Sequence, residues 1–213
     1  MSTDPLLALT VTTPVLQLCG ATEELLDRLA AHVRNGQADA EPPPFDDPIS
    51  LYEADPELRV QKWRQGINRG RVRFDSDSWR LYFAVVVDGE PVGMQDLLGA
   101  RDGNDRTVTT FSWLAAAFRG RGIGREMRHA ILHLAFDGLG ASEATSSAFT
   151  DNSGSNAVSR ALGYEPDGIE WQTRRGQRAP MQRWRLTRAV WQRERRDDIR
   201  LDDVQAASVR LGW

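Results

Sequence analysis

The stretch that most constrains this chain is a segment rich in glycine and arginine, residues 118–125, which reads Phe-Arg-Gly-Arg-Gly-Ile-Gly-Arg. It follows a predicted strand at residues 107–114 and opens a predicted helix at residues 122–136, whose apolar side chains recur at helical spacing. Glycines in such a junction let the backbone approach a ligand, and the NH groups at a helix N-terminus attract anions. With its three arginines the segment predicts a cradle for a pyrophosphate, and an ordinary glycine-rich turn is the alternative.

Two common phosphate-binding motifs do not match this segment. A dinucleotide-binding fingerprint requires the spacing G-x-G-x-x-G, and Arg125 stands where the third glycine would be. A nucleoside-triphosphate loop requires Gly-Lys followed by Ser or Thr, and the segment contains no lysine. Both classes of nucleotide-binding motif are therefore excluded here.

The rest of the chain predicts a mixed fold of strands and helices. Thr22 is expected to cap a first helix, and Asp88-Gly89 to form a hairpin turn. Residues 1–196 are expected to form a single domain, and residues 197–213 a loosely attached tail. The predicted strands cover residues 8–18, 81–87, 90–98, 107–114, 143–149, 168–174 and 181–186, with a break after residue 102, and further helices begin at Asn152 or Ser153 and near Thr187.

The composition limits the class of protein. Hydrophobic residues make up 40% of the 213 residues, which is enough for a sizeable core. Cys19 is the only cysteine, so an intramolecular disulfide and a cysteine metal cluster are excluded. The net charge of -3 argues against a general nucleic-acid binder, and no stretch is apolar for long enough to span a membrane. We expect a soluble protein of the reducing cytoplasm, without a targeting segment.

A second segment, residues 152–164, carries another motif, and the two motifs together indicate a family. Together the two segments resemble the GNAT superfamily of N-acetyltransferases, in the branch that includes acetyltransferases of ribosomal-protein N-termini. The coenzyme A signature of that family (Arg or Gln, two residues, Gly, one residue, Gly or Ala) is matched by Arg119, Gly122 and Gly124. The branch pattern N-x-x-S-x-x-V-x-x-x-L-G-F/Y is matched by Asn152, Ser155, Val158, Leu162, Gly163 and Tyr164.

The resemblance implies an α/β (α+β) fold with a central, mostly antiparallel mixed sheet flanked by helices. The fourth and fifth strands of that fold, here residues 107–114 and 143–149, would be splayed apart. It also implies direct transfer of acetyl from acetyl-CoA to a primary amine in a ternary complex, with the acceptor amine as partner and a homodimer as assembly. The residues implied to bind the cofactor are Trp113, Leu114, Arg119, Gly120, Arg121, Gly122, Ile123, Gly124, Asn152 and Ser155.

Two catalytic groups that are common in this family are missing. The fourth strand often carries a glutamate as base, and residues 109–114 contain no carboxylate. The tyrosine that often precedes the Gly-Phe/Tyr pair by four residues is replaced by Ser159.

By resemblance, Ser155 is predicted to be a general acid or thiolate stabiliser, with helix capping as the alternative. Asp96 is predicted to be the general base, with an outward-facing strand residue as the alternative, and Ser112 is a candidate for ordering a water instead.

An acidic stretch, residues 39–57, falls where this family builds the wall that faces the acceptor. It predicts attraction of a cationic amine, and a solvated loop is the alternative. Trp63, Trp79 and Tyr82 are candidates for an aromatic side of that wall or for the core. Because an α-amino group loses its proton at a lower pH than lysine does, a site with a weak base favours an N-terminal or small α-amine.

Two further signals favour structural interpretations. His129 and His133 are four residues apart, but an H-E-x-x-H motif and cysteine partners are absent, so no metal is predicted. Residues 171–200 hold ten arginines against three acidic residues. A nucleic-acid or ribosome contact is one interpretation of them, and a half-buried strand with a solvated face is the favoured one.

The alternative to an enzyme is a non-catalytic acyl-CoA-binding or ribosome-associated module.

Overall fold

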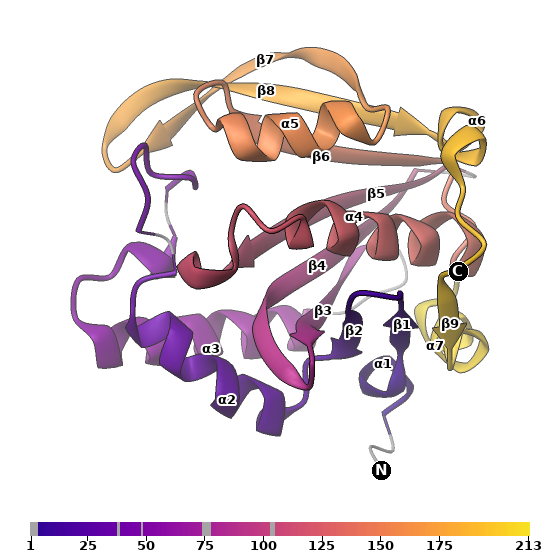
Figure 1. The fold of residues 1–213 in the computed structure, drawn as a ribbon, viewed down its shortest axis with the longest axis horizontal. Helices are drawn as coiled ribbons and strands as arrows, with labels where there is room; N and C mark the ends of the chain where they lie inside the picture. The colour runs from indigo at the N-terminus through magenta and orange to yellow at the C-terminus, as the bar shows by residue number, and fades with distance from the viewer. Residues whose placement is uncertain (1–3, 38, 48, 74–77, 103–104) are drawn as a thin grey trace.

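A mixed sheet runs through the computed structural model, which describes residues 4–37, 39–47, 49–73, 78–102 and 105–213 (Figure 1). Its strands are β1 (Thr10–Thr12), β2 (Gln17–Gly20), β3 (Ser78–Val87), β4 (Glu90–Asp102), β5 (Asp105–Leu114), β6 (Glu143–Phe149), β7 (Glu165–Arg174), β8 (Gln177–Thr187) and β9 (Arg200–Asp202). They form one sheet in the order β7-β8-β6-β5-β4-β3-β2-β1-β9. Neighbouring strands are antiparallel except β5 and β6, which are parallel. The predicted mostly antiparallel mixed sheet is confirmed, and the predicted break at residues 103–104 lies outside the described residues.

Helices cover both faces of this sheet. The helices are α1 (Pro5–Ala8), α2 (Glu23–Arg34), α3 (Pro56–Val72), α4 (Ile123–His133), α5 (Ser153–Ala161), α6 (Arg188–Trp191) and α7 (Val204–Leu211), with short turns η1 (Ser50–Tyr52), η2 (Ala116–Phe118), η3 (Leu134–Gly138) and η4 (Gln192–Glu194). Along β3, Phe83 and Val85 pack into the core shared with α4, and Ala84 and Val86 into the core shared with α2 and α3. This alternation follows from the two-residue period of a strand. Within the described residues, no helix is long and apolar enough to cross a bilayer.

Local sequence signals explain several element boundaries. Asp88 and Gly89 have φ angles of 50° and 80°, the left-handed pair that a tight hairpin turn needs. The Thr22 hydroxyl accepts a hydrogen bond from the Leu25 NH group at 3.4 Å and caps α2. The Asn152 side chain caps α5 in the same way, through the Ser155 NH group at 3.2 Å. The predicted hairpin and these two predicted caps are confirmed.

The strands β5 and β6 form a fork. They pair over three positions only, Thr107 to Thr109 against Glu143 to Thr145. Beyond that point β5 continues beside β4 as far as Leu114, and β6 continues beside β8 as far as Phe149, so the two strands diverge (Figure 1). The predicted splay is confirmed, and the N-terminal end of α4 lies at its open side.

The first predicted strand and the region of α3 differ from the sequence-based prediction. The strand predicted over residues 8–18 is divided into β1 and β2, because Thr13 and Pro14 start a turn in which the Thr13 hydroxyl accepts from the Leu16 NH group at 3.1 Å. The helix α3 was not predicted. Its apolar stripe is weak, since only Val60, Trp63 and Ile67 among its apolar side chains are buried.

Residues 197–213 do not form a loose tail. The strand β9 pairs with β1 in antiparallel register and so becomes an edge of the sheet. Trp213 is 9% exposed and its ring packs edge-on against Trp79, with ring centroids 4.8 Å apart. Ile199 and Leu211 join the same core. The prediction failed because the charged residues 193–198 suggested a solvated tail, and the apolar residues that follow them were not recognised as part of the core.

Candidate functional site

The fork opens into a cavity of about 950 Å³. Its walls come from the inner ends of β3 to β6, from α3, from the beginnings of α4 and α5, and from the loop at residues 40–51. One end of the cavity is formed by the glycines before α4, and β3 and β4 contribute a charged pair to its wall. Segments far apart in the sequence therefore line one space, and both sequence motifs face it.

The glycine segment presents open backbone to the cavity. Gly120 and Gly122 have φ angles of 71° and 81°, a region that residues with side chains rarely adopt. A Cβ atom added at either glycine would meet nothing within 4 Å, and one at Gly124 would meet only Leu114 Cδ1 at 3.9 Å. Gly122 is the N-cap of α4 and lines the cavity, so the start of the helix, where the first NH groups have no partner within the helix, adjoins this space. The geometry suits a phosphate group.

The arginines of this segment differ in what they contact. The Arg119 guanidinium donates to the carbonyl oxygens of Leu114 at 3.0 Å, Asp39 at 3.2 Å and Gln37. Burial lowers the pKa of Arg119, and Asp39 opposes that shift. The Arg121 side chain is exposed and lies over the Phe118 ring at 5.5 Å. Arg119 and Arg125 line the cavity, and Arg121 does not, so the expectation that all three arginines face the phosphate site fails at Arg121.

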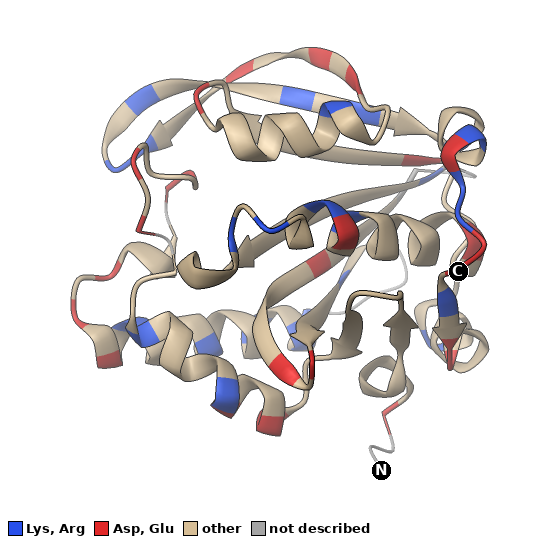
Figure 2. Cartoon of the chain, viewed as in Figure 1, with Lys and Arg blue, Asp and Glu red and all other residues tan. Residues whose placement is uncertain are grey.

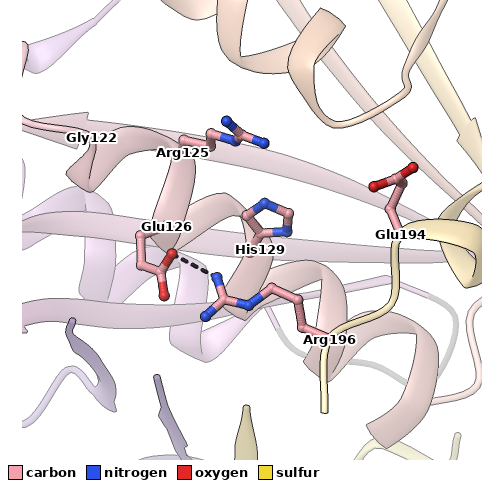
Figure 3. A pocket seen from close by; sticks show the side chains of 6 residues that line it. All are labelled: Gly122, Arg125, Glu126, His129, Glu194 and Arg196. Carbon is pink, nitrogen blue, oxygen red and sulfur yellow. Dashed lines mark hydrogen bonds and ion pairs between the residues drawn. The ribbon is translucent and has the colours of Figure 1, made fainter. Parts of the chain in front are cut away.

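Basic residues nevertheless gather where α4 begins, and acidic residues mark the loop at residues 39–55 (Figure 2). A smaller pocket of about 360 Å³ adjoins the cradle on the outer side of α4 (Figure 3). Gly122 and Arg125 line both spaces. In the smaller pocket Arg196 donates to Glu126 at 2.7 Å, so the segment after α6 contacts the helix that carries the cradle.

The predicted cofactor-binding residues mostly line the cavity. Ile123 does not, because its side chain is 4% exposed and belongs to the core, and neither does Arg121. Ser159, at the position of the usual tyrosine, is fully buried and lies outside the lining. Those that line it are Trp113, Leu114, Arg119, Gly120, Gly122, Gly124, Asn152 and Ser155.

Asp96 lies in the cavity wall and is 4% exposed. Its Oδ2 atom accepts from Arg80 Nε at 3.0 Å and from Arg80 Nη2 at 2.5 Å. Its Oδ1 atom is buried and has no hydrogen-bond partner among the described residues. Burial raises the pKa of Asp96 to about 6, against the opposing effect of Arg80. Asp96 is therefore a carboxylate at neutral pH with one oxygen free to accept a proton or a hydrogen bond.

The acidic stretch forms part of the same wall. Glu41, Phe45 and Asp46 line the cavity beside Trp63 and Tyr82. Trp79 does not contribute, because it packs in the core against Trp213. The loop is also joined to the β7–β8 turn: the Asp47 NH group donates to Thr173 O at 2.6 Å, and its carboxylate accepts from the Gly176 NH group at 2.8 Å. The acidic wall is thus held in place by a hairpin from the far end of the sheet.

Arg80 and Arg128 also line the cavity, and neither was predicted from the sequence to be a site residue. Arg80 stands on β3 two positions before Tyr82, which pairs with Asp96, so a cross-strand charge pair could have been predicted once the register was known. Arg128 interrupts the predicted helix next to its apolar positions, and such a break in the pattern was the only available signal.

The chain belongs to the GNAT acetyltransferase family. The model of the acetyltransferase (GNAT) domain matches residues 22–165, which include both motif segments and the fork. The family resemblance read from the sequence is thereby confirmed.

Solved structures share the fold. RimL, a ribosomal L7/L12 alpha-N-protein acetyltransferase solved with coenzyme A, has 20% identity and a TM-score of 0.65, over 82% of this chain and 95% of that one. Mycobacterium smegmatis RimJ, solved as a CoA-disulfide complex, has 20% identity and a TM-score of 0.70, over 84% and 85% of the two chains. The microcin C7 self-immunity acetyltransferase MccE, solved with acetyl-CoA and AMP, has 14% identity and a TM-score of 0.62, over 82% and 93%.

Proposed function

We propose that this protein transfers the acetyl group of acetyl-CoA to a primary amine. The observation that carries the proposal is the continuous cavity of the fork, which joins an open glycine cradle to a buried carboxylate. Family membership and the cofactors bound to RimL, RimJ and MccE support it. Acetyl-CoA supplies an activated thioester, and the protein supplies binding, orientation and proton acceptance.

The proposed binding residues follow the cavity from its open side. The backbone of residues 119–124, the first NH groups of α4 and the Arg125 side chain would hold the pyrophosphate. The smaller pocket behind Arg125 would take the nucleotide end. Around Trp113 and Leu114, β5 pairs with β4 but has no β6 partner, and the Leu114 carbonyl accepts from Arg119. The remaining polar groups on the open edge would be available to the pantetheine arm and to the oxyanion.

Two residues are proposed for the proton transfers. Asp96 accepts a proton from the acceptor amine, since its Oδ1 atom is otherwise unpartnered. Ser112, the alternative for ordering a water, pairs with Gln95, so its side chain is on the opposite face of the sheet from that of Asp96. Ser155, which lines the cavity at the start of α5, assists the departing sulfur. With a base of pKa about 6, the acceptor must already be largely deprotonated near neutral pH, which favours an α-amine over a lysine side chain. The acidic wall attracts such a cationic acceptor from solution. Action in the cytoplasm stays a prediction of the composition, and a homodimer stays a prediction of the resemblance.

Calorimetric titration with acetyl-CoA tests the proposal first, followed by turnover with α-amine and lysine acceptors. We expect micromolar binding to the native protein and none to Gly124→Glu, because a carboxylate would face the pyrophosphate. Ala31→Glu, the same charge on an exposed position of α2, is the control and should bind normally. Ser155→Ala should bind normally and turn over more slowly.

Three results would contradict the proposal. Unchanged binding by Gly124→Glu would show that the cradle is misplaced. Tight binding without turnover on any amine would favour a non-catalytic acyl-CoA-binding module. A preference for lysine side chains in competition would contradict the α-amine assignment.

A further inference from the structure

Arg128 is a buried cation in the wall of the fork. It lies on α4, is 4% exposed and lines the cavity. It follows Gly124 by one helical turn, so its backbone lies about 6 Å farther along α4 from the cradle. The proposed phosphate ligands do not include it, and no other role assigned to the cavity uses it.

The hydrogen bonds of Arg128 leave its charge uncompensated. Its Nη1 atom donates to Ser146 Oγ at 3.0 Å, and its Nε atom is buried without a partner among the described residues. The nearest acid on the helix, Glu126, is paired with Arg196 at 2.7 Å instead. No carboxylate in the described part of the chain forms an ion pair with Arg128. A buried guanidinium held only by neutral groups is costly, and an anion in the cavity would offset that cost.

The neutral groups around Arg128 all lie where the fork begins. Ser146 directly follows Thr145, the last residue of β6 that pairs with β5. The Thr110 hydroxyl donates to Thr145 O at 3.4 Å. Burial raises the pKa of Tyr164, with Arg128 and Thr110 close enough to oppose the shift, so the phenol is neutral near pH 7. The guanidinium is therefore placed at the closed end of the fork, away from the open glycine cradle.

We propose that Arg128 stabilises the thiolate of coenzyme A as it leaves. The inference rests on the proposed function. A ligand whose phosphates lie at the cradle and whose arm follows β5 from Leu114 towards Thr110 spans about 13 Å and brings its sulfur end to the closed part of the fork. The amine nitrogen forms a bond to the acyl carbon, the C–S bond breaks, and its electron pair goes to sulfur. Asp96 takes the amine proton, and the sulfur departs as a thiolate beside Arg128.

This role also accounts for the missing tyrosine. Ser159, at the tyrosine position, is fully buried and outside the cavity lining, so it cannot protonate the sulfur. A nearby cation lowers the pKa of a thiol, and a thiolate that is stabilised in this way can leave without receiving a proton. Arg128 would thus act beside Ser155: the hydroxyl assists the departing sulfur, and the guanidinium stabilises the negative charge that the sulfur carries.

The test measures the ionisation of bound coenzyme A. The ultraviolet absorption of the thiolate is followed against pH in the stoichiometric complex, beside free coenzyme A. The titration is made above pH 7, where Asp96 across the cavity is ionised and burial keeps His129 on the next helical position neutral. We expect the bound thiol to ionise at least one pH unit below the free thiol. Accordingly, coenzyme A should bind at least tenfold more tightly than desulfo-coenzyme A at high pH.

Variants separate this role from a structural one. Arg128→Met should abolish both the shift and the tenfold preference while it still binds desulfo-coenzyme A, and Arg128→Lys should restore part of both. Arg125→Met should weaken binding of the two ligands equally. An unshifted thiol in the native complex, or equal loss of both ligands in Arg128→Met, would overturn the inference and leave the proposed function standing. If Arg128→Met does not fold, the native titration and Arg128→Lys decide. Failure of the native protein to bind either ligand would overturn the proposed function itself.

Discussion

The two ends of the cavity are built in different ways. The cradle end is one continuous segment, residues 119–124, and it offers backbone atoms and open space. The acceptor end brings Asp96 and Arg80 together with Trp63 and Glu41, which come from four separate elements. Backbone recognition suits a ligand shared by many enzymes, whereas side chains from several elements suit a ligand that differs among them. The proposed donor site is therefore local in sequence, whereas the proposed acceptor site is assembled by the fold from distant segments.

Arg119 links the two ends, and its removal should have the largest effect. Its guanidinium donates to carbonyl groups on both sides, to Leu114 before the cradle, and to Gln37 and Asp39 where the acidic stretch begins. Arg119→Met should lower the free energy of unfolding by about 3 kcal/mol, because several charge-assisted hydrogen bonds are lost at once. Urea denaturation measures this change.

Arg121→Met is the matched control. Arg121 is exposed, so its loss should change stability by less than about 0.5 kcal/mol. Arg119→Lys should recover little, because an ammonium lacks the planar fork that reaches separate carbonyls. If the Arg119 and Arg121 variants are equally stable, the two ends are not joined through Arg119.

Alanine variants of the three glycines test which positions of the cradle need a residue without a side chain. Gly120→Ala and Gly122→Ala should each cost about 1 kcal/mol, since both residues have a left-handed backbone. Gly124 lies inside α4 with only a 3.9 Å contact, so Gly124→Ala should raise stability by about 0.5 kcal/mol. Urea denaturation of the three variants checks the order. Equal effects at all three positions would mean that backbone conformation does not distinguish them.

A pH titration probes the acceptor end. The folded pKa of Asp96, about 6, lies above the unfolded value of about 3.9, so the folded state binds the proton more tightly. Its contribution to stability is therefore fully present below pH 4 and is lost as the pH rises through 6. Relative to that of Asp96→Asn, the free energy of unfolding of the native protein should fall by about 1 kcal/mol between pH 5 and pH 6. Parallel stability curves for the two proteins would contradict the burial of this carboxylate.

The same contrast explains what could be predicted from the sequence. The cradle was recognised because its glycines, arginine and helix start are neighbours in the chain, and the Asn152 cap for the same reason. The conformations of the arginine side chains were not predictable. Arg119 bonds to carbonyls contributed by residues about eighty positions earlier, and no local pattern reports such a contact.

The acceptor end shows where sequence reasoning stops. Asp96 was predicted to be the general base, but its burial and its pairing with Arg80 depend on the register of β3 and β4. Arg128 is a charged residue next to the apolar positions of the predicted helix. Its role depends on its place in the fork, and the fork is formed by several segments, so no single segment could predict that role. The packing of Trp213 was missed because the charged residues 193–198 led to the prediction of a loose tail, although the apolar residues that follow them complete the core.

The order of the strands determines which edges of the sheet could pair with another molecule and start aggregation. A sheet with unpaired edges can recruit a strand from another molecule. At one edge β9 has three residues, and Arg200 and Asp202 bond to each other at 3.0 Å, so this edge is short and charged. At the other edge β7 has ten residues, with a register shift between Pro166 and Ile169, and Ile169 and Trp171 are 52% and 55% exposed. In concentrated solution, aggregation should therefore begin along residues 169–174, and a charged substitution there should delay it.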